Sequence, residues 1–99
     1  MVARRLEFTR RALRDIEAIE SYYIEEAGPE VADDAVDAIL AQDGKLTAPI
    51  VEYRPGIRKG TREYVMTRFP YTLVYLSDAK TVTILRVIHQ RSKFFNRGA

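Results

Sequence analysis

The sequence contains no cysteine and no tryptophan, and His89 is its one histidine. Without cysteine the chain has no disulfide, no thiolate ligand and no thiol nucleophile, so its stability must come from packing. One histidine cannot complete a closed zinc shell, and we expect neither a metal nor a cofactor. No apolar run approaches the roughly 18 residues that a membrane span requires, and Arg4 and Arg5 lead into no signal-like apolar segment. These absences predict a cytoplasmic protein without a membrane partner.

The chain has 99 residues, of which 46% are hydrophobic and 30% are charged. This balance is typical of a globular protein, and the length is suited to one core. We therefore expect a single domain over residues 1–99, in which the polar residues 92–99 form a flexible tail.

The net charge of +2 conceals a strong separation of charge along the chain. Ten acidic residues and no basic residue lie from Asp15 to Asp43, whereas residues 44–99 hold eleven bases and three acids. Five arginines precede the acidic stretch. Such a separation is typical of a surface for an anionic partner, although a solvated polar face would show the same pattern.

The N-terminal part predicts a strand followed by a helix. Residues 2–8 alternate loosely between apolar and polar side chains, as in a short strand. The hydroxyl of Thr9 is suited to accept a hydrogen bond from the first turn of a helix. From Ala12 to Ala27 apolar residues recur every three or four positions, which indicates an amphipathic helix of about five turns.

A second helix is expected after the Gly28–Pro29 corner, because glycine can end a helix and proline can begin one. Its apolar side runs from Val31 to Leu46 and includes alanines that allow a close approach to the first helix. Pro49 is expected to end this helix. The acidic residues fall mostly on the outer faces of the resulting helical hairpin.

In the second half of the chain the apolar period shortens to two, which predicts strands. The pair Pro55–Gly56 marks a turn, and strand-like runs follow at residues 62–68, 71–77 and 81–89. The last run is apolar on both faces, so we expect it inside the sheet. The predicted order is β-α-α-β-β-β, an α+β fold in which the helical hairpin packs on an antiparallel sheet.

Arginine is the most frequent base in this half, and its planar fork matches phosphate or carboxylate. The candidate residues flank the turn before the strand at 62–68 and the end of the last strand, and they are Arg58, Lys59, Arg62, Arg86, His89 and Arg91. Strand alternation places Arg86 on the same face as Val82 and Ile84. It places His89 on the same face as Val87.

Several candidates also have a purely structural interpretation. Arg86 can pair with a helix carboxylate, and His89 can form a hydrogen bond with backbone at a strand end. Phe94 and Phe95 either cap an edge of the sheet or dock a partner, and the sequence leaves both interpretations open. Core packing is expected for the strand tyrosines Tyr64, Tyr71 and Tyr75.

Four segments in order resemble the RelE/ParE superfamily of small bacterial toxins from type II toxin–antitoxin modules. These segments are residues 12–19, 60–63, 70–75 and 84–91. The similarity extends over residues 3–92, and the ordered set is more specific than any single piece. The resemblance implies the RelE/ParE-like fold, which agrees with the element order that the residue pattern predicts.

The superfamily implies one of two activities. RelE-like members are ribosome-dependent endoribonucleases that cleave messenger RNA, whereas ParE-like members inhibit DNA gyrase. Metal-free RNA cleavage needs an acid or base and fixed positive charge around the phosphate. In a nuclease the resemblance would give these roles to His89 and to Arg62 and Arg86, and a ParE-like protein would have no catalytic residue.

We favour the ParE-like branch. Many nuclease members carry a tyrosine near the C-terminus that contacts RNA, and this chain has no tyrosine after Tyr75. The His89-x-Arg91 ending and the Gly-Thr-Arg-Glu stretch at 60–63 also look more like ParE-like toxins.

The resemblance implies a cognate antitoxin whose C-terminal segment wraps the toxin, with DNA gyrase as the target. Ribosome and messenger RNA are the alternative target, and operator DNA would be contacted only through the antitoxin. A domain that shares the fold but serves as a plain interaction module is a third interpretation. The residues expected to bind the target or the antitoxin are Arg58, Lys59, Arg62, Arg86, His89, Arg91, Phe94 and Phe95.

Overall fold

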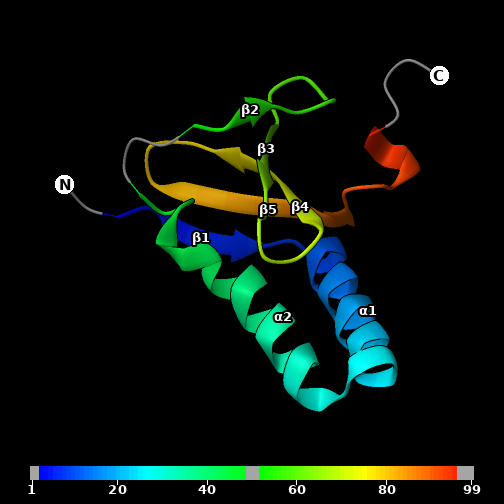
Figure 1. Ribbon diagram of the computed structural model, residues 1–99. Helices are drawn as coiled ribbons and strands as arrows, with labels where there is room; N and C mark the ends of the chain where they lie inside the picture. The colour runs from blue at the N-terminus through cyan, green and yellow to red at the C-terminus, as the bar shows by residue number, and fades with distance from the viewer. Residues whose placement is uncertain (1–2, 49–51, 96–99) are drawn as a thin grey trace.

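The computed structural model describes residues 3–48 and 52–95, which form a five-stranded sheet with two helices on one side (Figure 1). The strands are β1 (Arg5–Phe8), β2 (Arg54–Pro55), β3 (Arg62–Val65), β4 (Tyr71–Ser77) and β5 (Thr81–His89). The helices are α1 (Arg10–Ala27) and α2 (Pro29–Ala41), and the short 3₁₀ turns are η1 (Gln42–Gly44) and η2 (Lys93–Phe95). Neither helix of these described segments has the length and apolar character needed to cross a bilayer.

The helical hairpin begins and turns where the sequence predicts. Thr9 caps α1, because its Oγ1 accepts a hydrogen bond from the amide of Ala12 at 3.1 Å. Gly28 joins the two helices with a φ of 92°, a conformation that favours glycine, and Pro29 begins α2. The two helices then lie side by side, as Figure 1 shows.

The second helix ends earlier than the sequence predicts. The chain leaves α2 at Gln42, whose φ of 35° is left-handed and whose amide donates to the carbonyl oxygen of Ala38. The side-chain oxygen of Gln42 then accepts a hydrogen bond from the amide of Leu46 at 2.9 Å. Leu46 therefore reaches the core from the segment after η1 and not from a helix. Pro49, the expected helix end, lies outside the described residues.

The sheet is mixed, which corrects the expected antiparallel sheet. Its order is β1-β5-β4-β3-β2, and β1 runs parallel to β5 while the other neighbours are antiparallel. A helical hairpin follows β1, so no tight turn forces it to be antiparallel to its neighbour. The parallel direction brings Thr9 beside β5, where its amide donates to the carbonyl oxygen of Ile84 at 3.0 Å.

The individual strands agree with the predicted order, with differences at the edge of the sheet. β5 lies between β1 and β4, as its apolar run predicts. β3 is shorter than the run at 62–68, because the amide of Met66 already closes the turn to Tyr71. The sequence does not predict β2, which pairs with β3 at the sheet edge, where the missing N–H of Pro55 is tolerated.

The two ends of the chain lie partly outside the described residues. Of the strand expected at residues 2–8, Arg5–Phe8 form β1, and residue 2 is not among the described residues. Of the tail expected at residues 92–99, Lys93–Phe95 form η2, and residues 96–99 lie outside the description.

A β-bulge in β5 reverses the expected placement of Arg86. In β4, Val74 pairs with Arg86 and the next residue, Tyr75, pairs with Ile84, so Leu85 is an extra residue. An extra residue shifts the alternation of all side chains that follow it. Ile84 belongs to the core under the helices, and Arg86 consequently lies on the opposite face, contrary to the prediction from simple alternation.

The core lies between the helical hairpin and one face of the sheet. Three alanines in the helices, Ala12, Ala32 and Ala35, are fully buried and allow the close approach that the sequence predicts. The strand tyrosines expected in the core are also buried, and these are Tyr64, Tyr71 and Tyr75. Neither described helix covers the other face of the sheet, which we call the open face (Figure 1).

Candidate functional site

The side chains of Thr9, the cap of α1, and of Asp15 within α1 replace β1 as the neighbour of the second half of β5. β1 ends at Phe8, and from there the Thr9 Oγ1 donates a hydrogen bond to the carbonyl oxygen of Leu85 at 3.0 Å. Further along, the amide of Val87 donates to Asp15 Oδ2 at 2.9 Å. The backbone groups at this exposed edge of β5 are therefore satisfied by side chains rather than by another strand.

Asp15 also fixes the guanidinium of Arg86. Arg86 Nε lies 2.8 Å from Asp15 Oδ2, and Arg86 Nη2 lies 3.2 Å from Asp15 Oδ1. Arg11 Nε, one turn earlier on α1, lies 3.8 Å from Asp15 Oδ1. The paired geometry holds the planar guanidinium in one orientation. Arg86 thus forms the ion pair with a helix carboxylate that its structural interpretation requires.

Arg86 lines a cavity of about 330 Å³ on the open face. Arg11 and Arg58 line the same cavity, together with the apolar side chains of Val74 and Phe94. Guanidinium groups beside an apolar surface are suited to bind an anionic group that carries an aliphatic or aromatic part. We call these residues the arginine pocket.

A tight loop between β2 and β3 positions Arg58. The amide of Gly56 donates to the carbonyl oxygen of Thr61 at 2.8 Å, and Thr61 Oγ1 donates to the carbonyl oxygen of Arg58 at 2.6 Å. A Cβ at Gly56 would collide with the Thr61 side chain, so only glycine fits at this close approach. The loop therefore holds Arg58 at the rim of the arginine pocket and leaves Lys59 exposed.

Of the other predicted residues, the structure places Arg62 and Arg91 away from the arginine pocket and Phe95 beside it. Arg62 Nη1 donates to the carbonyl oxygen of Tyr53 at 3.1 Å, and its Nη2 lies 3.4 Å from Glu52 Oε2, beside the edge strand β2. Arg91 is exposed beyond the end of β5. The Phe95 ring packs edge-to-face on Phe94, with 5.0 Å between the ring centroids.

His89 lies in different surroundings from Arg86. Its ring packs edge-to-face on Tyr71, with 5.5 Å between centroids, and lines a second cavity with Tyr22 and Tyr23. Its Nδ1 accepts a hydrogen bond from the amide of Arg91 at 3.0 Å. His89 thus makes the backbone bond that its structural interpretation expects, and the structure does not bring it together with Arg62 or Arg86.

Sequence reasoning missed several residues that line the cavity of the arginine pocket, among them Arg11 and Thr61, and it missed a third hollow. Arg11 and Thr61 were not predicted, because only the fold brings the start of α1 and the β2–β3 loop to β5. The third hollow is a groove of about 290 Å³ between α2 and the end of β3. The sequence does contain a signal for this groove. Ala38 and Ala41 are three residues apart, and their small side chains leave room on one side of α2.

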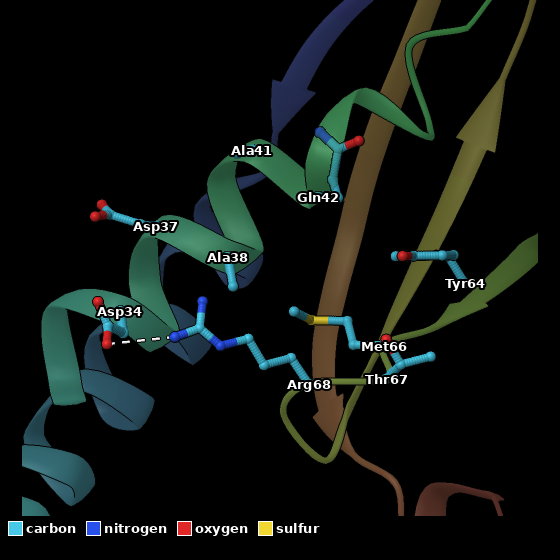
Figure 2. Close-up of a pocket in the computed structure, with 9 residues that line it drawn as sticks. All are labelled: Asp34, Asp37, Ala38, Ala41, Gln42, Tyr64, Met66, Thr67 and Arg68. Atoms are coloured by element: carbon cyan, nitrogen blue, oxygen red, sulfur yellow. Dashed lines mark hydrogen bonds and ion pairs between the residues drawn. The ribbon is translucent and has the colours of Figure 1, made fainter.

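Figure 2 shows this groove and the charges at its rim. The side chains of Tyr64 and Met66 face α2 across the groove. Arg68 reaches over from the strand side, and its Nη2 lies 3.4 Å from Asp34 Oδ2. The groove therefore combines polar and apolar side chains with an exposed ion pair, and one acidic residue of α2, Asp34, has a cationic partner.

Residues 6–94 match the family described as the ParE toxin of the type II toxin–antitoxin system, parDE. The chain belongs to this ParE toxin family. A protein of Sinorhizobium fredii (strain NBRC 101917 / NGR234) named as a candidate toxin, Y4kP, is 35% identical over 98 residues. That alignment covers 95% of this chain and 96% of the relative.

Solved structures from two toxin–antitoxin systems share the fold of this ParE-family chain. A chain of the chromosomal ParDE toxin–antitoxin system from P. aeruginosa superposes with a TM-score of 0.78 and 30% identity, covering 88% of this chain and 96% of that chain. A chain of the toxin–antitoxin complex RelBE2 from Mycobacterium tuberculosis superposes with a TM-score of 0.57 and 27% identity, covering 93% and 97%. The predicted RelE/ParE-like α+β fold is confirmed.

Proposed function

We propose that this ParE-family toxin acts by binding DNA gyrase and not by cutting RNA. The separation of His89 from Arg86 and Arg62 carries the proposal. Metal-free cleavage needs an acid or base and positive charge at one phosphate. Here the imidazole packs on Tyr71 on the helix side of the sheet, while Arg86 lines the arginine pocket on the open face. This arrangement supports a toxin that has no catalytic residue.

The arginine pocket is the surface that we propose for contact with the target protein. Its guanidinium groups match carboxylates, and the ring of Phe94 gives an apolar surface next to them. Arginines and aromatic side chains are the residues that most often carry the binding energy of protein interfaces. Arg86 is already oriented by Asp15, so little side-chain entropy is lost when it binds.

We infer that a cognate antitoxin neutralises this toxin by covering the same face. The ParDE and RelBE2 relatives are toxin–antitoxin systems, and the resemblance implies an antitoxin segment that wraps the toxin. Acidic residues of such a segment would pair with the arginine pocket, and the segment would become ordered on binding. The antitoxin would make the contacts with operator DNA, and the complex would act in the cytoplasm.

Two assays in parallel separate the proposed activity from the alternative. Purified protein is added to gyrase in a supercoiling assay and to programmed ribosomes that carry messenger RNA. We expect inhibition of supercoiling and no cleavage of RNA. Ribosome-dependent cleavage that is lost in His89→Ala and Arg62→Ala would instead establish the nuclease alternative and overturn the proposal.

A charge reversal tests whether the arginine pocket contacts gyrase. Arg58 is exposed in a loop, so Arg58→Glu should fold normally and weaken inhibition about tenfold or more. Lys80→Glu makes the same charge change at the exposed β4–β5 turn and should alter inhibition less than about twofold. Equal effects of the two variants would show that net charge, and not the pocket, controls inhibition.

Growth experiments test the antitoxin. Expression of the chain alone should arrest growth, and coexpression with the small open reading frame next to its gene should restore growth. A chain that leaves growth unaffected would favour a plain interaction module that shares the fold.

A further inference from the structure

A cluster of aromatic rings connects α1 with the turn between β3 and β4 and with the end of β5. Tyr22 and Tyr23 pack edge-to-face with 5.2 Å between centroids, and Tyr23 lies 6.4 Å from Tyr71. Tyr71 in turn lies 5.5 Å from the ring of His89. At its other end the cluster continues to Phe69, 5.7 Å from Tyr23. We call this set the aromatic cluster.

The chain already places a guanidinium at one end of the aromatic cluster. The Cζ of Arg68 lies 5.3 Å from the centroid of the Phe69 ring, and its Nη2 lies 3.4 Å from Asp34 Oδ2. A cation over an aromatic face is attracted by the negative charge density of that face. This end of the cluster thus combines a ring, a guanidinium and a helix carboxylate.

The opposite end has the same kind of ring surface, but it is open. A cavity of about 310 Å³ is lined by Tyr22, Tyr23, Pro70, Tyr71 and His89, and no Asp, Glu, Lys or Arg side chain of the described chain lines it. Two backbone contacts hold these walls in place. Tyr71 pairs with His89 between β4 and β5, and the amide of Gln90 donates a hydrogen bond to the carbonyl oxygen of Pro70 at 2.8 Å.

A carboxylate stands one helical turn from this cavity. Glu26 follows Tyr22 by four residues and Tyr23 by three, so it lies on the helix face between them. Glu26 forms no ion pair with the described residues, and the last turn of α1 contains no base. The open end therefore attracts cations.

The phenol ring of Tyr71 is uncharged. Burial and a hydrogen bond with Tyr23 raise the pKa of Tyr71 above its ordinary value of 10.0, so its phenol stays protonated. Arg91 comes two residues after His89 in the sequence but does not line the cavity. Arg68 is engaged at the other end with Phe69 and Asp34.

We propose that the cavity of Tyr22, Tyr23 and Tyr71 binds the guanidinium of an arginine side chain from a protein partner, with Glu26 as its counter-ion. The site is separate from the arginine pocket and would recognise the opposite charge. It would allow one partner chain with both acidic and basic residues to contact both sites.

The single histidine makes this proposal directly measurable, because the ring resonances of His89 report on the cavity. The full-length protein is titrated with Nα-acetyl-arginine methylamide and followed by NMR of the His89 and tyrosine rings. We expect saturable shifts at His89 and Tyr71. The ring pair Tyr53 and Tyr64, which packs elsewhere with 4.9 Å between centroids, should not shift.

Two neutral probes test the need for positive charge. Nα-acetyl-citrulline methylamide has nearly the same shape as the arginine probe and no charge, and it should bind at least about fivefold more weakly. Nα-acetyl-norleucine methylamide, which is also neutral, should likewise bind at least about fivefold more weakly than the arginine probe. Binding of either neutral probe as tight as that of the arginine probe would overturn the proposal in favour of an apolar pocket, and so would the absence of a saturable shift at His89.

Matched variants test the counter-ion and the ring. Glu26→Gln should weaken binding of the arginine probe by about 3- to 10-fold, whereas Glu25→Gln, the same change one position away on α1, should alter it by less than about twofold. Tyr22 is 56% exposed, so its replacement should not unfold the protein. Tyr22→Phe should keep the affinity and Tyr22→Ser should lower it, and equal affinity of all four variants would contradict the proposed site.

Discussion

The two halves of β5 are held in the sheet in different ways. Residues 81–84 pair with β1 on one side, and residues 82–84 pair with β4 on the other. After the bulge at Leu85, residues 86–89 pair with β4 alone, and side chains of Thr9 and Asp15 satisfy the opposite edge at Leu85 and Val87. One half thus depends on two backbone ladders and the other on one ladder and a few side chains.

This difference shows how one strand serves both stability and recognition. The first half buries Val82 and Ile84 under the helices. The second half presents Arg86 to the arginine pocket and His89 to the aromatic cluster, on opposite sides of the sheet. A single extra residue separates the two roles, because it changes which face each later side chain occupies.

Removal of an apolar side chain from the first half should have the largest effect. Ile84 is 0% exposed, so Ile84→Ala should lower the free energy of unfolding by about 2–5 kcal/mol, through lost burial and a residual cavity. Denaturant unfolding measures this change. Leu76→Ala, at a residue that is 42% exposed on β4, should cost less than about 1 kcal/mol. Similar costs for both variants would contradict the assignment of Ile84 to the core.

Replacement of Asp15 should affect mainly the second half. Asp15→Asn removes the charge that pairs with Arg86 and weakens the bond to the Val87 amide, which should cost about 1–3 kcal/mol. Amide hydrogen exchange should become faster at Val87 than at Val82. Asp33→Asn, at an exposed residue of α2, should change stability by less than about 0.5 kcal/mol. Uniformly faster exchange along β5 would show that the two halves open together.

Replacement of Asp78 in the turn before β5 should have the smallest effect on stability, and that effect should depend on pH. Asp78 Oδ1 accepts hydrogen bonds from the amides of Lys80 and Thr81, both at 2.8 Å, and these bonds lower the pKa of Asp78 from its ordinary value of 3.8. A lowered pKa in the folded state stabilises the protein above the unfolded pKa, and this stabilisation is lost as pH falls through the folded pKa.

The comparison with Asp78→Asn measures this contribution. The native protein should have the higher denaturation midpoint at pH 7, and the difference should disappear as the pH falls below the ordinary value of 3.8 and through the lower folded pKa. A difference that persists at the lowest pH would show that the carboxylate charge is not its origin.

Local chemistry made much of the hairpin and strand pattern predictable. The cap at Thr9, the Gly28–Pro29 corner and the strands that contain Tyr71 and Ile84 follow from residues that are close in sequence. The candidate site was less predictable. Arg58, Arg86 and Phe94 were expected and do line one pocket, but Arg62 and His89 lie elsewhere, because their position depends on strand register.

The sequence by itself determined the helical hairpin, the apolar strands, the separation of charge and the resemblance to a toxin superfamily. Each of these depends on residue type and short spacing. Only the tertiary structure decided the parallel direction of β1, the bulge at Leu85 and which face of the sheet Arg86 and His89 each occupy. The direction of β1 depends on pairing between segments more than 70 residues apart, as do the contacts of Thr9 with Leu85 and of Asp15 with Arg86, whereas the bulge depends on the register between β4 and β5. Local periodicity contains no information about the register of such distant pairs.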